Sequence, residues 1–552
     1  MASGAEWDVR GNAELRSLGV LGLFVALAVL HTWPLASAPG TLSRHDNGDA
    51  ILNEWTVAWV AHQLPRDPLR LFDANIFHPE PNTLAYSEHL LVQGLLGAPL
   101  LWAGAPPTLV HNLLLIAGLA LSGWTMALVM HRWTDDWWAA ILSGMLLAFN
   151  AHTLSRLAHL QALHVEFLPL AVYALHRVLT SPGTKIAAAL ALAFVLQALT
   201  SNYLLVLLAF GLAAAALFRV VEWFGPGRWR VLGYLGLSGL IAGALLAPFL
   251  YPYFVARQQQ GLGRSLEEVA TYAASWQDYL AASGRLHYET WSAPFARGKG
   301  AFLFPGVTAL LLTGVAVVTG TAWSRPARLW IGLGLAGLVL SFGASAPGYR
   351  FLYEMLPLLQ GIRATVRFGF LVLAAIAALA AFGFAAIRAR LRHRPALLAV
   401  SSVTVLLLVT VEAARVPLGY TPALRVSPVY TFLADDPGAV LVELPLYAPP
   451  DVHRNAPYML NSTAHWRPIV NGYSGFLPRD YRAHWEAARE FPDPAALAYL
   501  RALGVTHTAV HLDTFAELYG QDRLERLAGA PGLSLVARTG TMSLFRLNGG
   551  VP

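Results

Sequence analysis

The chain has 552 residues, of which 56% are hydrophobic and only 13% are charged, and this composition predicts a polytopic membrane protein because it leaves too little polar surface for a soluble one. The formal net charge of +6 does not indicate nucleic-acid binding, because the basic residues form short clusters between apolar runs. The absence of cysteine excludes disulfides, thiolate metal sites and cysteine nucleophiles.

Apolar segments of spanning or near-spanning length follow one another along most of the chain and predict an α-helical membrane protein with about eleven transmembrane helices. The first segment is longer than a usual signal-peptide core, so we expect an uncleaved first span. A shorter apolar run at residues 90–102 is broken by Pro99, so we expect it to be re-entrant or interfacial. The predicted spans are residues 18–36, 109–130, 137–149, 165–179, 186–199, 204–218, 231–250, 302–318, 329–342, 366–387 and 396–411.

The charges of the connecting segments predict the orientation. Basic residues such as Arg132, Lys185 and Arg325 collect in short connectors of one face, which by the positive-inside rule is cytoplasmic and carries the N-terminus. An odd number of spans then places everything after Arg415 outside. We find no internal repeat of the kind expected for a transporter, so we expect the function at the outer surface. The outer face also receives the long polar segments 41–88, 150–164, 251–301 and 343–365.

The first outer loop, residues 38–89, is the strongest candidate for chemistry. Asp46 and Asp49 lie three residues apart at the start of a predicted helix. Trp55 and Trp59 share one face of that helix, which favours a position in the headgroup layer with both acids at the membrane surface. Asp49 is a candidate catalytic base, the N-cap of the helix, or both. Asp46 is a second candidate or a solvated loop acid.

Glu88 closes the same loop and has two explanations. With Ser87 as N-cap, it would meet the dipole favourably at the start of the helix predicted from residue 90. Alternatively it is catalytic or binds a divalent metal ion through a set of oxygen and nitrogen ligands. The candidate metal ligands are Asp46, Asp49, Glu88 and His89, with His45 close by in the sequence.

Polar residues crowd the outer end of the fourth predicted span. Ionisable side chains at a span boundary are costly unless they face a wet cavity, so a role in lining a site is favoured over packing. A tyrosine at the start of the sixth span falls on the same rim. The candidate substrate-lining residues are His159, Gln161, His164, Glu166 and Tyr203.

Arg363 and Arg367 are four residues apart and are predicted to share one helix face at the outer start of the tenth span. A guanidinium fork suits the phosphate or diphosphate of a lipid. The alternative is that both arginines anchor the helix to lipid headgroups.

Residues 415–552 have the pattern of a soluble α/β domain on the outer face, following a membrane domain of residues 1–414. A long loop, residues 458–476, is rich in aromatic and polar groups, and such loops are more often functional than idle. His465 and Tyr473 are its candidate substrate-lining residues. We expect strands over residues 439–444, 505–510, 533–537 and 542–547 and helices over residues 494–503 and 515–527.

An aspartate in a long first outer loop, a multispan core and a soluble outer C-terminal domain resemble the C-type membrane glycosyltransferase superfamily, which includes the protein O-mannosyltransferases and the lipid A aminoarabinose transferases. The resemblance implies a polyprenyl-phosphate sugar donor and a first-loop aspartate that acts as base or metal ligand, for which Asp49 is the best match and Asp46 the second. The adjacent acidic pair of the O-mannosyltransferases is absent, so the base and the metal requirement stay open. Strings similar to a bacterial branch of this superfamily are GDA at 48–50, FHPEPNTLAYSEH at 77–89, LAHLQ at 157–161 and RATVRF at 363–368.

Two functions are therefore in view for a multi-pass protein of the bacterial cytoplasmic membrane. The first is transfer of a sugar from a polyprenyl-phosphate-linked donor to an acceptor glycan, lipid or protein on the outer face, with the base among Asp49, Asp46 and Glu88. The second is non-enzymatic binding or translocation of a lipid-linked glycan, which needs Arg363 and Arg367 but not the acids. Membrane lipids are expected partners, and nucleic acid is not.

Overall fold

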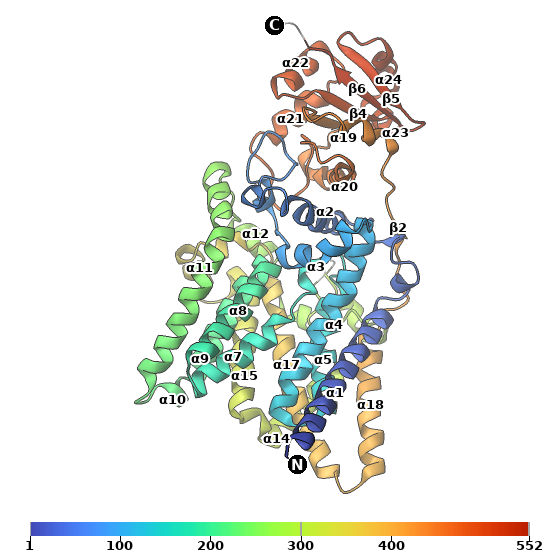
Figure 1. Ribbon diagram of the computed structural model, residues 1–552. Helices are drawn as coiled ribbons and strands as arrows, with labels where there is room; N and C mark the ends of the chain where they lie inside the picture. Colours follow the sequence, from blue (N-terminus) through green and yellow to red (C-terminus); the bar gives the residue numbers. More distant parts are fainter. Residues whose placement is uncertain (1, 298–300, 550–552) are drawn as a thin grey trace. The chain divides into compact units, whose positions relative to one another are not determined.

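The computed structural model describes residues 2–297 and 301–549, with side chains from residue 14 onward (Figure 1). By its contacts the chain divides into two compact units. Unit 1 comprises Met1–Pro39, Asn112–Pro248 and Gly263–Gly419, and unit 2 comprises Gly40–His111, Phe249–Leu262 and Tyr420–Pro552. The sequence groups the first outer loop with the membrane domain, whereas its contacts group it with the C-terminal segment.

Each of the eleven apolar segments contains a helix. In the described part of the chain these helices run all or mostly through unit 1, and short helices and 3-10 turns join them. The shorter α-helices of this unit are α6 (Ala151–Leu154), α10 (Val220–Trp223), α12 (Leu266–Thr271), α13 (Arg285–His287) and α16 (Tyr349–Met355). The helices of the apolar segments are α1 (Ala2–His31), α4 (Pro107–Thr134), α5 (Trp137–Ala148), α7 (Phe167–Thr180), α8 (Thr184–Thr200), α9 (Asn202–Phe218), α11 (Arg228–Gln260), α14 (Val307–Val318), α15 (Arg325–Ser341), α17 (Gly369–Leu391) and α18 (Pro395–Ala413).

Length and composition identify a multi-pass membrane protein. Within the described residues, six helical stretches are long and apolar enough to cross a membrane. α5 and α14 have only 12 residues each, about 18 Å of helix against a hydrocarbon core of about 30 Å. The count of eleven spans therefore stays a prediction. The six candidate spans are Glu14–His31, Pro107–Thr134, Leu160–Thr180, Arg228–Gln260, Thr365–Leu391 and Pro395–Ala413.

Helix α17 is central to the packing of unit 1. It packs against α5, α14 and α15, and α15 in turn packs against α9 (Figure 1). A side chain at Gly383 of α17 would lie 1.9 Å from the carbonyl oxygen of Leu312 in α14, so only glycine permits this approach. Small residues bring helices close where the surroundings provide little hydrophobic driving force, which accounts for the alanine-rich sequence of α17.

In the described part of unit 2, four strands form one sheet in the order β3-β4-β6-β5. β3 (Leu441–Leu444) is parallel to β4 (His507–His511), while β6 (Met542–Leu547) is antiparallel to both β4 and β5 (Leu533–Arg538). Strands therefore form in all four predicted places. The remaining elements of the C-terminal segment are β2 (Thr421–Pro422), paired with β1 (Leu42–Ser43) of the first loop, α19 (Thr431–Ala434), α20 (Ala456–Asn461), α21 (Tyr481–Ala488), α22 (Pro494–Ala502), α23 (Leu512–Tyr519) and α24 (Gln521–Arg526).

The single helix predicted over residues 515–527 is wrong, because two helices occupy this region. α23 ends at Tyr519 and α24 begins at Gln521. Gly520 between them has a φ of +95°, which breaks the helix and which side chains rarely allow.

Helix α2 (Gly48–Gln63) forms the centre of the first-loop part of unit 2. It packs against α3 (Leu91–Trp102) and α20. We expected the face with Trp55 and Trp59 to meet the headgroup layer, but protein covers it: all residues from Ala50 to Ala61 are buried, and Trp55 and Trp59 are only 1% and 4% exposed. The depth of α2 in the membrane stays a prediction. The two indoles do share a face and stack at 6.2 Å. The spacing in the sequence predicted that the two tryptophans lie on one face, but it did not predict that other parts of the protein cover them.

The contact between α2 and α3 depends on Gly94. A Cβ atom at Gly94 would lie 2.3 Å from Val60 Cγ1, which is too close for any side chain. We expect Gly94→Ala to lower the free energy of unfolding by about 1–3 kcal/mol through overpacking, measured as a lower unfolding midpoint of the purified protein. Gly239→Ala in α11 is the control, because nothing lies within 4 Å of the added Cβ. An unchanged midpoint for Gly94→Ala would show that the helices separate without cost.

Candidate functional site

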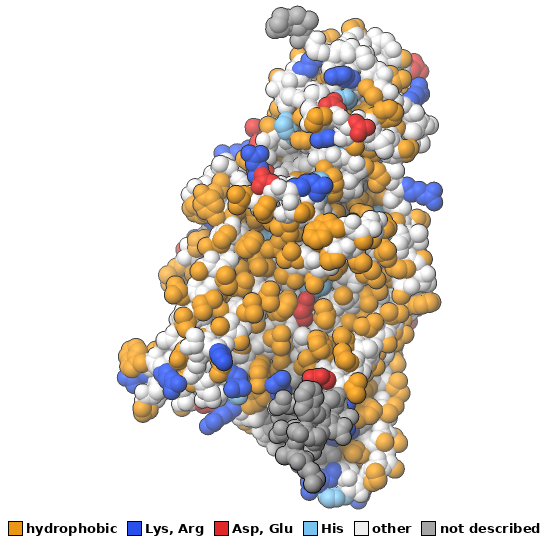
Figure 2. All heavy atoms as spheres, in the orientation of Figure 1, with side chains coloured by type: hydrophobic (Ala, Val, Ile, Leu, Met, Phe, Trp, Pro, Cys, Tyr) orange, Lys and Arg blue, Asp and Glu red, His pale blue; other side chains and the backbone are white. Residues whose placement is uncertain are grey.

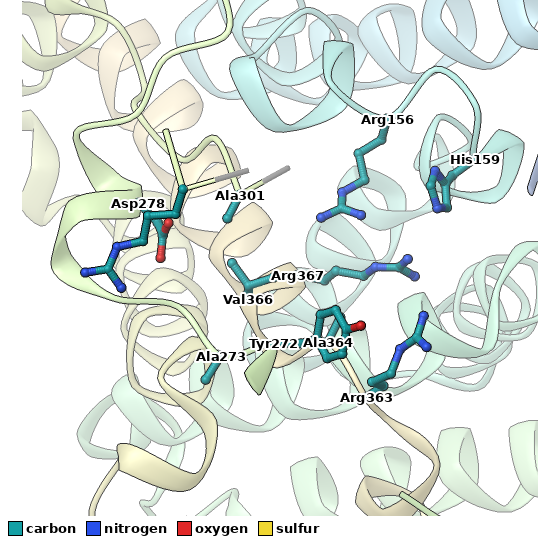
Figure 3. A pocket seen from close by; sticks show the side chains of 11 residues that line it. Arg156, His159, Tyr272, Ala273, Asp278, Ala301, Arg363, Ala364, Val366 and Arg367 are labelled. Carbon is teal, nitrogen blue, oxygen red and sulfur yellow. The ribbon is translucent and has the colours of Figure 1, made fainter. Parts of the chain in front are cut away.

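A cavity of about 110 Å³ in unit 1 gathers basic side chains from segments far apart in the sequence. Arg156 and His159 follow α6, whereas Arg363 and Arg367 precede α17. Figure 3 shows these four side chains gathered on one side of the cavity, with Asp278 apart from them on the other side. The structure therefore brings together three residues that the sequence singled out, His159, Arg363 and Arg367, and adds Arg156, which the sequence analysis missed.

Two tyrosines hold the arginines of the second segment. The guanidinium of Arg367 lies 4.0 Å from the ring centre of Tyr203, and that of Arg363 lies 4.8 Å from the ring centre of Tyr272. The hydroxyl of Tyr203 also accepts hydrogen bonds from the backbone N–H groups of Arg363 and Ala364, each at 3.3 Å. Tyr203 thus supports both arginines, through its ring in one case and through the backbone in the other.

The prediction that Arg363 and Arg367 share an α-helical face is wrong. Residues Thr365–Phe368 form a 3-10 turn, and α17 begins only at Gly369. The chain before this turn is held by the Tyr203 hydroxyl, and the turn itself is held by the hydrogen bond from Val366 N to the Tyr272 carbonyl. Both arginines nevertheless line the same cavity, because the non-helical backbone turns them toward it.

The two acidic groups near the cavity are already engaged, and one of them is shared with a cavity arginine. Asp278 accepts hydrogen bonds from the backbone N–H and the hydroxyl of Ser275, at 2.6 and 2.9 Å. Glu268 is paired with Arg264 at 2.9 Å and lies 3.9 Å from Arg363. The Nε of Arg367 is buried without a hydrogen-bond partner among the described residues. A fork with an uncommitted N–H group at a cavity suits an anion such as phosphate.

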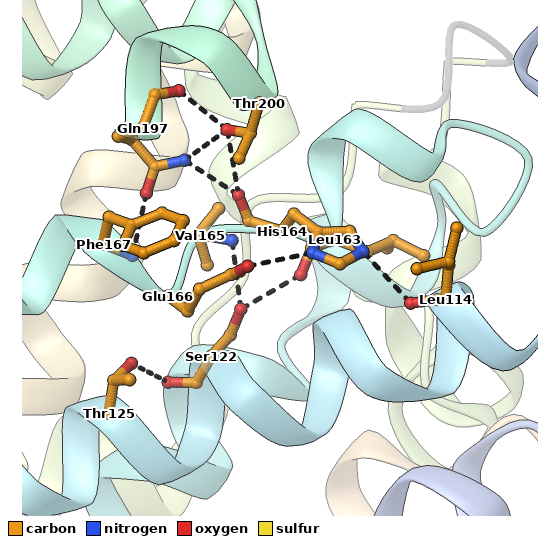
Figure 4. Close-up of polar contacts among 10 residues, drawn as sticks. All are labelled: Leu114, Ser122, Thr125, Leu163, His164, Val165, Glu166, Phe167, Gln197 and Thr200. Carbon is orange, nitrogen blue, oxygen red and sulfur yellow. Dashed lines mark hydrogen bonds and ion pairs between the residues drawn. The ribbon is translucent and has the colours of Figure 1, made fainter. Parts of the chain in front are cut away.

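His164 and Glu166 belong to an internal hydrogen-bond network and not to this cavity (Figure 4). The Nε2 of His164 donates to the Leu114 carbonyl at 3.1 Å, and its Nδ1 lies 3.0 Å from Glu166 Oε1. The amide of Gln197 donates to the His164 carbonyl at 2.8 Å. The sequence favoured a site-lining role because the polar groups lie at a span boundary, but His164 and Glu166 contact each other inside the protein. Gln161 is buried in the preceding 3-10 turn.

In unit 2, the predicted base and a predicted loop residue meet. The hydroxyl of Tyr473 donates a hydrogen bond of 2.7 Å to Asp49 Oδ1, across 424 positions of sequence. Asp49 is not the N-cap of α2: the helix begins at Gly48, and the side chain of Asn47 accepts the hydrogen bond from the Asp49 N–H. Because Asn47 caps the helix, the carboxylate of Asp49 is directed to Tyr473 instead. A side chain at Gly48 would lie 3.3 Å from the Tyr473 ring.

The other acid of the first loop has a different setting. Asp46 is 47% exposed and forms an ion pair with Arg44 at 3.1 Å, as a solvated loop acid does. The side chain of His45 is only 3% exposed; it accepts a hydrogen bond from Leu424 N at 3.0 Å and lies 2.8 Å from Glu54 Oε2. The sequence analysis did not single out Glu54, which has no motif and is only 2% exposed.

The first-loop residues do not fit a metal site. In the part of the chain that the structure describes, no group of three or more His, Asp or Glu side chains is placed to hold a metal ion. Asp46 is committed to Arg44, and the Nδ1 of His89 accepts the backbone N–H of Leu91. Ser87 is not the N-cap of α3, because the helix begins at Leu91, after Leu90 in a left-handed conformation. Glu88 is 8% exposed beside it.

His465 supports the C-terminal loop. Its ring stacks on Tyr430 at 5.6 Å, and its Nδ1 accepts the backbone N–H of Arg467. Burial, together with the charge of Arg467, lowers the pKa of His465 to about 4, so the ring is neutral at physiological pH. With 5% exposure it is a packed residue and offers little surface to a substrate.

Comparison with known proteins places this fold. No model of a known protein family matches the chain, and no curated protein matches its sequence significantly. The archaeal oligosaccharyltransferase AglB from Archaeoglobus fulgidus, solved with an inhibitory peptide and a dolichol-phosphate, is similar over 98% of this chain and 75% of its own, with a TM-score of 0.50 and 12% identity. ArnT from Cupriavidus metallidurans bound to undecaprenyl phosphate is similar over 97% of this chain and 99% of its own, with a TM-score of 0.51 and 14% identity.

Both similar proteins are polytopic membrane glycosyltransferases of the C-type superfamily. The chain therefore has the fold of that superfamily. The resemblance found in the sequence is confirmed at the level of the fold.

His89 gives the first loop a pH dependence. Burial lowers the pKa of His89 to about 4, whereas the unfolded chain has a histidine pKa of about 6.5. Between these values only the unfolded state binds the proton, so the stability is complete above about pH 6.5 and falls as the pH drops toward 4. The loss at pH 5 is about 2 kcal/mol.

His89→Asn keeps a hydrogen-bond acceptor and does not titrate. We expect its unfolding midpoint to fall less than that of the unaltered protein between pH 7 and pH 5. His393→Asn, at an exposed histidine, should leave the pH dependence unchanged. The same decline in His89→Asn and in the unaltered protein would contradict the assignment.

Proposed function

We propose that this chain is a membrane glycosyltransferase that moves a sugar from a polyprenyl-phosphate-linked donor to an acceptor on the outer face of the bacterial cytoplasmic membrane. The observation that carries the proposal is the arginine cavity of unit 1 within a C-type fold. The similar proteins were solved with dolichol-phosphate and with undecaprenyl phosphate, which are lipid phosphates of the kind this cavity suits.

Arg363 and Arg367 bind the donor phosphate. Their guanidinium groups lie over the rings of Tyr272 and Tyr203, and a cation on an aromatic face is stabilised without using its N–H groups, which remain for oxygen atoms of the phosphate. When the bond between the sugar carbon and the phosphate oxygen breaks, the leaving phosphate keeps the electron pair and gains negative charge. The arginines stabilise that charge, which lowers the barrier of the step.

Asp49 acts as the base. Its carboxylate takes the proton of the acceptor hydroxyl while the acceptor oxygen forms the new bond to the sugar carbon. The hydrogen bond from Tyr473 fixes the orientation of the carboxylate. We also propose that residues 415–552 form a soluble domain on the outer face and that the N-terminus is cytoplasmic.

The donor role is tested by exchanging both arginines for lysine. Arg363→Lys with Arg367→Lys keeps two charges but removes the forks, so we expect binding of undecaprenyl phosphate to weaken about tenfold or more, since a charge-assisted hydrogen bond contributes about 1.5–3 kcal/mol. The measurement is lipid binding to the purified protein in detergent. Arg350→Lys is the control, because Arg350 is exposed and paired with Glu354. Unchanged lipid binding in the double variant would show that both arginines only anchor the chain to lipid headgroups.

The base is tested by Asp49→Asn. Asparagine can still accept the hydrogen bond from Tyr473, and Asn47 caps the helix in either case, so folding should be unaffected. We expect release of polyprenyl phosphate from lipid-linked sugars extracted from bacterial membranes to fall at least about 100-fold. Asp46→Asn is the matched control at an exposed acid and should stay active.

Full activity of Asp49→Asn would exclude Asp49 as the catalytic base. No transfer by the unaltered protein, together with tight lipid binding that needs the arginines, would instead favour binding or translocation of a lipid-linked glycan. Loss of activity on chelation would make Asp49 a metal ligand.

A further inference from the structure

A second basic cluster in unit 1 surrounds a single carboxylate, Glu222. Arg219 donates to both of its oxygens, at 3.0 and 2.6 Å, and is almost fully buried. Arg328 and Arg325 approach the same carboxylate at 3.3 and 3.5 Å. Burial alone would raise the pKa of Glu222, but the hydrogen bonds and charges of these arginines lower it. One ionised carboxylate is therefore the shared partner of three guanidinium groups.

The two outer arginines lack further anionic partners in the described part of the chain. Arg325 is 69% and Arg328 36% exposed at the side chain, and the Nε of Arg328 is buried without a hydrogen-bond partner. Both lie in the first turn of α15, which contains no acidic residue. The start of a helix favours negative charge and disfavours positive charge. An anion at this position would relieve the repulsion between the arginines and between them and the helix.

Apolar side chains surround the cluster. In α10 and just after it, Val221 is 93% and Phe224 57% exposed, and Trp229 at the start of α11 is 71% exposed. The guanidinium of Arg228 lies 5.4 Å from the ring centres of Phe224 and Trp229. Figure 2 shows Lys and Arg side chains among hydrophobic ones in the area where Figure 1 labels α10. Exposed apolar groups beside arginines suit the boundary between acyl chains and phosphates.

We propose that Arg325 and Arg328, next to the Arg219–Glu222 pair, bind the phosphate of an anionic phospholipid at the membrane boundary. The site is separate from the cavity proposed to hold the sugar donor and does not depend on that proposal. The lipid phosphate supplies the negative charge that Glu222 alone does not. The acyl chains of the same phospholipid lie against the exposed side chains of α10 and α11.

The test uses the full chain in lipid nanodiscs made of phosphatidylcholine alone or with phosphatidylglycerol. We expect phosphatidylglycerol to raise the unfolding midpoint and to remain bound in native mass spectrometry. Arg325→Gln with Arg328→Gln should lose this preference, with about 30-fold weaker phosphatidylglycerol binding, the factor that corresponds to about 1 kcal/mol for each arginine. Arg390→Gln, at an exposed arginine near the end of α17, is the matched control and should keep the preference.

Three results would overturn the proposal. The first is an unchanged preference for phosphatidylglycerol in the double variant. The second is an equal loss in Arg390→Gln, which would show a general effect of basic charge. The third is full stabilisation by inorganic phosphate in phosphatidylcholine nanodiscs, which would identify a soluble anion as the ligand. If the double variant does not fold, Arg325→Gln alone decides, because that side chain is mostly exposed and should lose part of the preference.

Discussion

The position of Tyr203 constrains the two cavity arginines that precede α17. Its ring carries the guanidinium of Arg367, and its hydroxyl holds the backbone at Arg363 and Ala364 before α17 begins. A cation on an aromatic face is stabilised without using its N–H groups, so the arginine is fixed in position while its donors stay available. A carboxylate in the same place would neutralise the arginine and compete with an anionic ligand. The tyrosine therefore keeps a charged group ready inside a mostly apolar protein.

Unit 2 shows how a loop gains rigidity from a distant segment. The first outer loop contributes α2 and Asp49, and the C-terminal segment contributes α20 and Tyr473. Ile51, Ala456 and Leu460 form a small apolar cluster against which Tyr473 packs. The short strand pair β1 and β2 and the hydrogen bond from Leu424 to His45 fasten the same two segments. A carboxylate held in this way keeps one geometry, which a catalytic or binding role requires.

Polar groups of similar appearance in the sequence have different roles in this protein. His159 and His164 are five residues apart, yet His159 lines the cavity and His164 is bound to Leu114 and Glu166 inside the helix packing. Buried polar groups must be hydrogen-bonded, and either a wet cavity or another part of the protein can meet that requirement. The 3-10 turn at Leu160–Ala162 lies between the two histidines in the chain. Polarity at a span boundary therefore indicates that a partner exists without identifying it.

The sequence by itself determined where the apolar helices and the strands of this protein form. Apolar runs and their periodicity located the helices of the membrane part and the four strands of the C-terminal sheet, because both patterns are local properties of the chain. It also singled out Asp49, Arg363 and Arg367 by type and position. Only the tertiary structure decided their surroundings: Asn47 as the cap of α2, the burial of Trp55, the arrangement of Arg156 beside Arg367, and the hydrogen bond between Tyr473 and Asp49. These depend on packing between segments up to hundreds of residues apart, and no local pattern of residues encodes such contacts.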